Sequence, residues 1–436
     1  MTHPNRRAFL GSSLASLVSV VAGHGAPPTP APDPRELGPE LAPAPRAVEP
    51  VPSTLAPQET MFLSWQRDPT TTMTVQWIGP PVADETTLRY VARAGDTWKL
   101  GRITLAEFPK TDFKVHRCEL TNLTPGTEYV FQIGKNSPVM KFRTMPAKAT
   151  DTFTFVSGGD CGTGPHAIGT NILAARQEPQ FALIGGDLGY DNGRSAGTAI
   201  KFLRNYARHM IDPKGRMVPL VACLGNHEVN GGYRGSRADA TFFLPLFDGL
   251  YKDTTYAALD FGDYLSLVLL DSGHISPVGG EQADWLDDVL RDREERPHLF
   301  AVNHVPAYPS VRNPETGRDG RLGTGEANRL HWCPLFERYR VDAVLEHHDH
   351  AFKRTHPLTD GLKDRYGVPY LGDGSWGQLR TPGPIEKRPY LARLSKAYHV
   401  TVHRLEGDQR YHVALEESGK IADVYGSTGK RPAKRG

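Results

Sequence analysis

The chain has 436 residues and a formal net charge of +2, from 51 Lys and Arg against 49 Asp and Glu. This balance excludes a nucleic-acid binder that depends on bulk positive charge. A mean hydropathy of −0.44 is too polar for an integral membrane protein. Since one domain usually takes roughly 100–200 residues, the length predicts two or three domains.

The first 26 residues have the features of an export signal. Arg6 and Arg7 precede a short, weakly apolar stretch interrupted by Ser and Gly. This stretch is too short and too polar for a transmembrane helix, and it resembles a bacterial twin-arginine signal. The alternative is a chance basic pair. We expect a signal peptide over residues 1–26 and a periplasmic or secreted protein, with the cleavage point left open.

Two further segments follow before the largest part of the chain. Residues 27–59 are dominated by Pro, Ala and Glu, which predicts an extended linker. Residues 60–146 hold six or seven short alternating runs, which predict an all-β sandwich. A Pro-Gly turn before Tyr129 resembles the corner of fibronectin type III domains. We interpret 60–146 as a fibronectin III-like module for packing and spacing, while carbohydrate or protein binding stays open.

Residues 150–426 have a different pattern. Apolar runs of strand length alternate with helical stretches such as 197–210 and 280–293. This alternation predicts a large α/β domain, and later strand-like runs are expected to complete one of its sheets. Residues 427–436 form a basic tail.

Five strand-like runs of this α/β domain end on loops that carry metal-binding residue types. These residues are Asp160; Asp187 with Tyr190; Asn226 with His227; His304; and His348 with His350. Ligands of α/β sheets gather beyond the carboxyl ends of strands, so the five loops are expected to meet at one edge. Each fragment alone also fits a turn or a hydrogen-bonded structural role. All five in the same position relative to a strand indicate a metal site.

The donor set consists of two Asp, one Tyr, one Asn and three His. Hard oxygen and nitrogen donors suit Fe, Mn or Zn, whereas a structural zinc site would favour a closed Cys/His set. Two metal ions account for this set of donor residues better than a single ion does. Paired ions about 3.5–4 Å apart recur in phosphoester hydrolysis.

The same loops carry recognisable sequence blocks. They are GGD (158–160), GGDLGY (185–190), GNHE (225–228), HVPAY (304–308) and HDHAFKR (348–354). These blocks resemble the five metal-binding blocks of the purple acid phosphatases, within the calcineurin-like metallophosphoesterases. The match covers about residues 152–380, and that family also carries a preceding fibronectin-like module. The resemblance implies a metallophosphoesterase β-sandwich flanked by helices.

The resemblance also implies a role for each ligand. Asp187 would bridge both metals. The ferric ion would be bound by Asp160, Tyr190 and His350, with the phenolate favouring Fe(III). The second metal, a divalent Fe, Zn or Mn ion, would be bound by Asn226, His304 and His348. The implied activity is an acid phosphatase reaction on small phosphate monoesters, by direct attack of metal-bound hydroxide and without a phosphoenzyme.

The resemblance implies only some of the residues that would contact the substrate. His227 would hydrogen-bond the substrate phosphate. A His pair that plant relatives carry beyond the His304 block is missing, and Arg318 and Arg321 stand in that stretch. Either arginine could clamp a phosphate as a fork donor. His227 and a solvent water both remain candidates for protonating the leaving alcohol.

Two departures concern the surroundings of the ligands. His347 stands where relatives usually have Gly, and Lys353 stands where Glu is common. We therefore expect the contacts behind the metal ligands to differ from those of relatives.

Two other functions remain open from the sequence. The same metals could hydrolyse phosphodiesters or nucleotides, which p-nitrophenyl phosphate and its bis-ester would separate. A protein of another class, a non-catalytic binder acting through residues 60–146, is disfavoured by the complete ligand set. The physiological substrate, the second metal and the oligomeric state are not indicated.

Overall fold

The computed structural model describes residues 49–81, 87–95, 97–135, 137–148, 152–316 and 322–429. They belong to one compact unit, Val48–Gly436. The predicted signal peptide, most of the predicted linker, Arg318, Arg321 and residues 430–436 lie outside the described ranges. None of the described helices combines the length and the apolar character needed to cross a bilayer.

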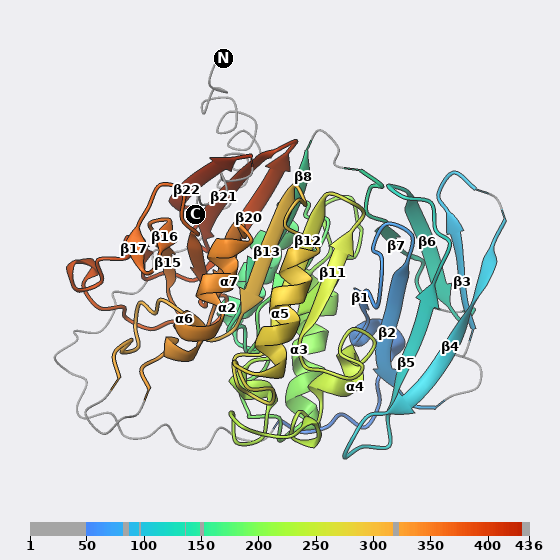
Figure 1. Cartoon of the computed structure of the whole chain (residues 1–436). Helices are drawn as coiled ribbons and strands as arrows, with labels where there is room; N and C mark the ends of the chain where they lie inside the picture. Colours follow the sequence, from blue (N-terminus) through green and yellow to red (C-terminus); the bar gives the residue numbers. More distant parts are fainter. Residues whose placement is uncertain are drawn as a thin grey trace. The chain divides into compact units, whose positions relative to one another are not determined.

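The N-terminal module is an antiparallel sheet (Figure 1). Its strands are β1 (Phe62–Ser64), β2 (Met73–Gly79), β3 (Thr87–Ala92), β4 (Lys99–Glu107), β5 (Lys114–Leu120), β6 (Glu128–Ile133) and β7 (Met140–Arg143). The order in the sheet is β1-β2-β5-β4-β3-β6-β7. The first half of β4 pairs with β3 and its second half with β5, so this strand joins the two halves of the sheet. The all-β prediction is confirmed.

The corner predicted before Tyr129 is present. The Tyr129 hydroxyl accepts a hydrogen bond from the Thr124 amide at 2.8 Å, and its ring stacks on Phe142 at 5.5 Å. Gly126 has a φ of +64°, a left-handed conformation that glycine adopts without strain. The turn therefore ties the start of β6 back to the preceding loop.

The α/β domain contains two mixed sheets. The first has the order β10 (Leu220–Ala222), β9 (Ala182–Ile184), β8 (Phe153–Gly158), β20 (His399–Glu406), β21 (Gln409–Glu416) and β22 (Ile421–Thr428). The second has the order β11 (Ala257–Phe261), β12 (Leu265–Leu270), β13 (His298–Asn303), β14 (Ala343–Glu346), β18 (Tyr370–Asp373), β15 (Phe352–Thr355) and β19 (Leu391–Ser395). A small hairpin pairs β16 (Leu358–Thr359) with β17 (Leu362–Lys363). The late strands β20–β22 thus complete the first sheet, as predicted.

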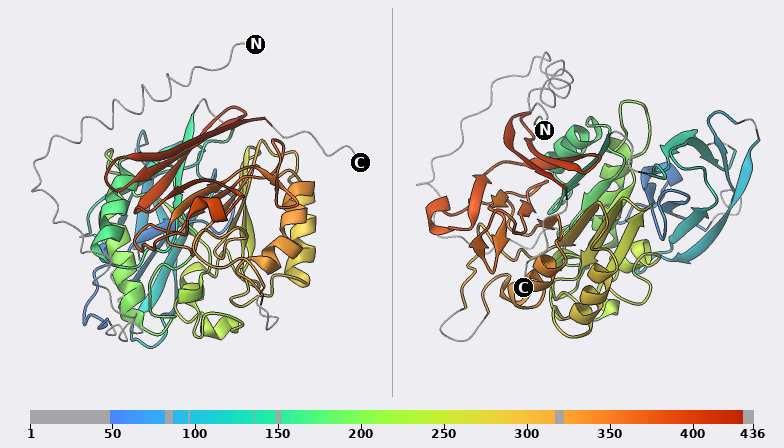
Figure 2. Two further views of the ribbon diagram at one scale, coloured as in Figure 1. Left: turned by 90° about the vertical axis from the view of Figure 1, so that its left-hand side faces the viewer. Right: turned by 45° about the horizontal axis from the view of Figure 1, so that its top comes forward.

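The two sheets pack face to face between helices (Figure 2). Phe155 of β8 meets Phe300 of β13 edge-on, with ring centroids 5.8 Å apart. Helices α2 (Pro165–Ala175) and α3 (Ala196–His209) lie on the side of the first sheet. On the side of the second sheet lie α5 (Glu281–Arg291), α6 (Glu326–His331) and α7 (Cys333–Arg338). This arrangement is the predicted sandwich flanked by helices.

The N-terminal module and the α/β domain share a buried core. Trp65, which follows β1 and is 2% exposed, makes T-shaped contacts with Phe181 at 6.0 Å and Phe261 at 5.7 Å. Phe62 of β1 contacts Phe247 at 5.6 Å. Phe247 ends the short helix α4 (Phe243–Phe247). The aromatic contacts hold the two modules together without any covalent link besides the chain.

Replacing Trp65 with alanine should destabilise the protein strongly. A buried Trp→Ala change leaves a cavity and removes apolar contacts, so we expect the free energy of unfolding to fall by about 3–5 kcal/mol. Urea denaturation followed by circular dichroism measures this loss. Trp98→Ala is the control, because Trp98 is 40% exposed and its loss should cost less than about 1 kcal/mol. Equal losses in the two variants would contradict a shared core.

Candidate metal centre

The predicted ligands follow five strands of both sheets. Asp160 follows β8, Asp187 and Tyr190 follow β9, and Asn226 follows β10; His304 follows β13, and His348 and His350 follow β14. From the sequence we expected these loops to meet at one edge of a single sheet, and this expectation was wrong. The five strands are divided between two sheets, which face each other and bring their loops together. Within each sheet these strands are parallel, so their carboxyl ends point the same way.

Three of the predicted ligands form a first group. The Tyr190 hydroxyl donates a hydrogen bond to Asp160 Oδ1 at 2.9 Å. His350 Nε2 lies 2.9 Å from the same oxygen and 3.1 Å from the Tyr190 hydroxyl. The three donor atoms thus converge on one point, as side chains around a single ion would.

Three others form a second group. His304 Nε2 lies 3.1 Å from Asn226 Oδ1 and 3.1 Å from His348 Nδ1. His304 Nδ1 lies 2.9 Å from the Gly185 carbonyl oxygen. Because a carbonyl only accepts, Nδ1 carries a proton and Nε2 faces the site, where its lone pair would bind a metal ion in place of a second proton.

Asp187 connects these two groups. Its Oδ2 lies 3.3 Å from His304 Nε2, while its Oδ1 accepts a hydrogen bond from the His227 amide at 2.8 Å. One ligand atom each of Asp160, Asp187, His304 and His348 lie within 4.8 Å of one another, and all four residues are buried. Asp187 Oδ2 is buried, and no N–H or O–H of the described residues donates to it. A buried carboxylate oxygen without a donor is costly, so this atom fits a metal ligand.

The electrostatics of the cluster favour bound cations. Burial alone would raise the pKa of Asp160, but the facing His350 imidazole lowers it well below its usual range. Burial and the charges of Asp160 and Asp187 raise the pKa of the Tyr190 phenol. Burial opposes a charge on His304, yet Asp187 raises its pKa to about 9. The carboxylates therefore attract positive charge, and a metal ion would compete with protons for these donors.

The backbone is strained at the ligand positions. Asp160, Asp187, His348 and His350 have φ values of 58°, 56°, 72° and 58°, in the left-handed region that side chains with a Cβ rarely adopt. Such conformations persist only where the surroundings enforce them, and they cluster at functional sites. Here the left-handed backbone forms tight turns that direct these four side chains toward the ligand cluster.

Glu228 holds the loop that carries Asp187. Its buried carboxylate accepts hydrogen bonds from the amides of Asp187 at 2.7 Å, Leu188 at 2.8 Å and Gly225 at 2.9 Å. A Cβ on Gly225 would collide with the Asp187 carboxylate. The Gly and the Glu of the GNHE block are therefore needed to bring the loops after β9 and β10 together.

The two departures from the family pattern have structural explanations. The His347 ring fills the space above Gly159 and Gly185, where a Cβ on either glycine would collide with it. His347 Nδ1 also lies 3.0 Å from the Asn303 carbonyl oxygen. Lys353 donates to the Tyr308 carbonyl at 2.5 Å and pairs with Glu346 in the interior. The contacts behind the ligands therefore include a buried ion pair.

Two residues that the sequence analysis missed contact His348. The Tyr233 hydroxyl lies 3.2 Å from His348 Nε2, and Tyr233 is 45% exposed. Arg312 donates to the His348 carbonyl and to Asp349 Oδ1, the latter at 2.9 Å. The only local signal for Tyr233 is the Gly231-Gly232 pair, whose φ values of +86° and +82° allow the turn that brings it back to the site.

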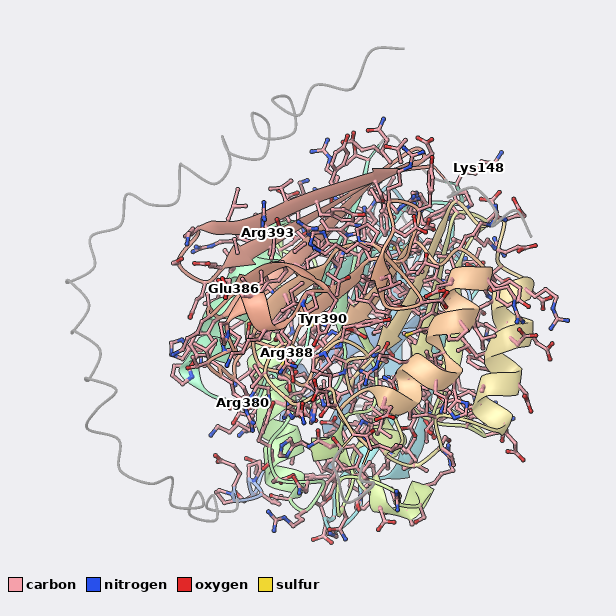
Figure 3. The ribbon with its side chains drawn as sticks, turned by 60° about the vertical axis from the view of Figure 1, so that its left-hand side comes forward. Lys148, Arg380, Glu386, Arg388, Tyr390 and Arg393 are labelled. Carbon is pink, nitrogen blue, oxygen red and sulfur yellow. The ribbon has the colours of Figure 1, made fainter. Side chains whose placement is uncertain are left out.

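The segment after β18 passes along one side of the site. The Arg380 amide donates to the His350 carbonyl at 2.8 Å. Arg388 donates to the Arg312 carbonyl at 2.8 Å, and the Tyr390 hydroxyl donates to the Pro309 carbonyl at 2.7 Å. Figure 3 labels Arg380, Arg388 and Tyr390 on this segment. The segment therefore fixes the loop of His350 and the loop of Arg312 to each other.

His227 lies beside the ligand cluster. Its ring packs against Tyr190 with centroids 4.1 Å apart, and its Nε2 lies 4.0 Å from Asp187 Oδ2. The side chain is 27% exposed, so it is accessible from solvent. Its role toward substrate stays a prediction, as do the individual ligand roles. Arg318 and Arg321 lie outside the described residues.

Comparison with protein families gives two matches. Residues 58–144 match the purple acid phosphatase N-terminal domain, and residues 154–352 match the calcineurin-like phosphoesterase domain. The chain is therefore a metallophosphoesterase with a buried Asp/His cluster consistent with a metal site. With both domains in this order, it belongs to the purple acid phosphatase family. Its substrates are phosphate esters.

Relatives and solved structures agree with this assignment. Acid phosphatase type 7 of Homo sapiens is 26% identical over 341 residues, 71% of this chain and 76% of that protein. Purple acid phosphatase 5 of Arabidopsis thaliana is 24% identical over 340 residues, 72% of this chain and 78% of that protein. The structure of a purple acid phosphatase from yellow lupin (Lupinus luteus) seeds has a TM-score of 0.68 at 16% identity. It covers 85% of this chain and 74% of its own, and it shows the shared fold.

Replacing Tyr233 with phenylalanine should weaken metal binding. With Nδ1 of His348 facing the site, its Nε2 carries the proton and donates to the Tyr233 hydroxyl. Losing such a partner typically lowers metal affinity by about 10–100-fold. Titration of metal-free protein with Zn²⁺ or Mn²⁺ against a chelator measures the change. Tyr366→Phe, at a 48% exposed position by the β16–β17 hairpin, is the matched control. Unchanged affinity in Tyr233→Phe would contradict this positioning role.

Proposed function

We propose that the chain is an acid phosphatase that hydrolyses small phosphate monoesters at a two-metal centre. The observation that carries the proposal is the buried Asp187 Oδ2, which accepts no hydrogen bond from the described residues and lies next to His304. Donor groups of three residues each adjoin this aspartate. The names of the relatives, acid phosphatase type 7 and purple acid phosphatase 5, support the monoester reaction.

The donor chemistry supports two different metals. Asp160, Tyr190 and His350 would hold Fe(III), because the phenol of Tyr190 has a pKa raised by burial and by neighbouring carboxylates. Only a strongly charged cation would keep it as a phenolate there. A divalent Fe, Zn or Mn ion would be held by Asn226, His304 and His348. When bound, paired ions lower the pKa of water and neutralise phosphoryl charge.

The protein's own residues would orient the ester. His227 is accessible beside Asp187, and its imidazole would hydrogen-bond the phosphate. Arg318 and Arg321 remain candidates for a second clamp. His227 and solvent water remain the two candidate proton donors to the leaving alcohol.

We also propose that the protein works in the periplasm or is secreted. The support is the sequence of the first 26 residues, with Arg6 and Arg7 before a short apolar stretch. Export in the folded state would suit a protein that acquires its metals in the cytoplasm.

Asp187→Asn should nearly abolish phosphatase activity. Removing the charge between the two donor groups removes several kcal/mol of electrostatic stabilisation, so kcat/KM should fall by at least about a thousandfold. Hydrolysis of p-nitrophenyl phosphate by the metal-loaded protein measures this. Asp292→Asn is the control, since Asp292 is exposed on the surface after α5. If Asp187→Asn keeps most of its activity, the two-metal reaction is wrong.

A further inference from the structure

An open recess adjoins the candidate metal centre. It lies between α3, α4 and the loop after Asp187, and the space in and immediately in front of it, solvent included, is about 450 Å³. Its apolar walls include Phe202 and Leu203 of α3, Phe243, Leu246 and Phe247 of α4, and Leu188 of the loop. Pockets for small organic groups have mostly apolar linings, as this recess does.

His227 belongs to both the recess and the metal centre. It lines the recess, while its Nε2 lies 4.0 Å from Asp187 Oδ2. Leu188 and Gly189, which also line the recess, directly follow Asp187 in the chain. A phosphate bound at the metal centre would therefore lie next to the recess, with His227 at the boundary.

Two polar side chains of the recess walls, Asp191 and Ser195, already have hydrogen-bond partners. The Asp191 carboxylate accepts hydrogen bonds from the amides of Arg194 and Ser195 at 3.3 and 2.9 Å. The Ser195 hydroxyl accepts from the Gly197 amide at 3.1 Å and donates to the Glu49 carbonyl at 3.1 Å. His227 Nδ1 has no hydrogen-bond partner among the described residues, but the rest of the lining is mostly apolar. A charged or hydroxylated group that moved past His227 into the recess would lose hydrogen bonds to water, which is costly. An apolar group makes no hydrogen bonds to water, so it would not pay this cost on entering the recess.

The N-terminal module supports the outer wall of the recess. Phe108 of this module contacts Phe242 with ring centroids 5.4 Å apart, and Lys110 Nζ lies 5.6 Å from the centre of the same ring. Phe62 contacts Phe247 of α4 at 5.6 Å. Figure 1 shows α4 beside the strands of this module. Because the wall is held by packing from both modules, an alkyl chain would enter a preformed space at a low entropic cost.

We propose that this recess binds the apolar alcohol group of the substrate, an alkyl chain attached to the phosphate. The proposal rests on the proposed phosphatase function and specifies its substrate class. The metal centre holds the phosphoryl group, His227 marks the boundary, and the carbon chain extends between α3 and α4.

The test measures binding of n-alkylphosphonates, from methyl to hexyl, to the metal-loaded full chain by titration calorimetry. These compounds keep the charged head constant, and their carbon–phosphorus bond prevents turnover. The affinity should rise about three- to fourfold with each added methylene until the recess is filled, as expected for methylene burial.

A variant that fills the recess gives a second measurement. Ala199 of α3 lines the recess and is partly exposed. Ala199→Leu should abolish the gain with chain length and leave the affinity for methylphosphonate unchanged. Ala283→Leu on α5, at a position of the same exposure class outside the recess, is the matched control and should behave as the unmodified protein.

Two outcomes would overturn the proposal: equal affinity for methyl- and hexylphosphonate in the unmodified protein, or an unchanged chain-length dependence in Ala199→Leu. Failure of the phosphatase function has a different signature. In that case phosphate esters would not be hydrolysed, while the affinity for phosphonates would still increase with chain length and support the recess.

Discussion

The burial of two carboxylates, Asp160 and Asp187, is the constraint on which the rest of the structure depends. Both are inaccessible to solvent, and removing such charges from water costs several kcal/mol each unless they are paired. Asp160 is paired with the Tyr190 hydroxyl, His350 and the His348 amide. Asp187 leaves one oxygen without a donor among the described residues. Cations bound there would compensate the charge and would also stabilise the fold, since they bind the folded state.

This constraint explains several features of the scaffold. The ligands come from two facing sheets, so the turns that carry them must be tight, and four ligand positions have left-handed φ values. Gly225 leaves room for the Asp187 carboxylate, and the His347 ring occupies the space that Gly159 and Gly185 leave free. The N-terminal module supports the scaffold of the site at a distance from the ligands, because its aromatic side chains pack against α4 and the residue before it.

The sequence predicted the features that local pattern determines. The strands before Asp160, Asp187, Asn226, His304 and His348 are buried apolar runs that end at turn residues, so both the strands and the ligand-bearing loops could be recognised. Strand β4 gives only a weak signal in the sequence, because most of its side chains are exposed in the fold. The contacts of Tyr233 and Arg312 with His348 join loops distant in the chain, and the division of the ligands between two sheets depends on strand pairing. No local pattern encodes either feature.

We propose that the chain holds two metal ions, one of them ferric. Metal analysis of the purified full chain, combined with its visible spectrum and an activity assay on the same sample, tests this most directly. We expect two ions per chain, including iron, together with an absorption band from phenolate-to-Fe(III) charge transfer. An active protein with a single ion per chain, or one that is colourless and free of iron, would contradict it.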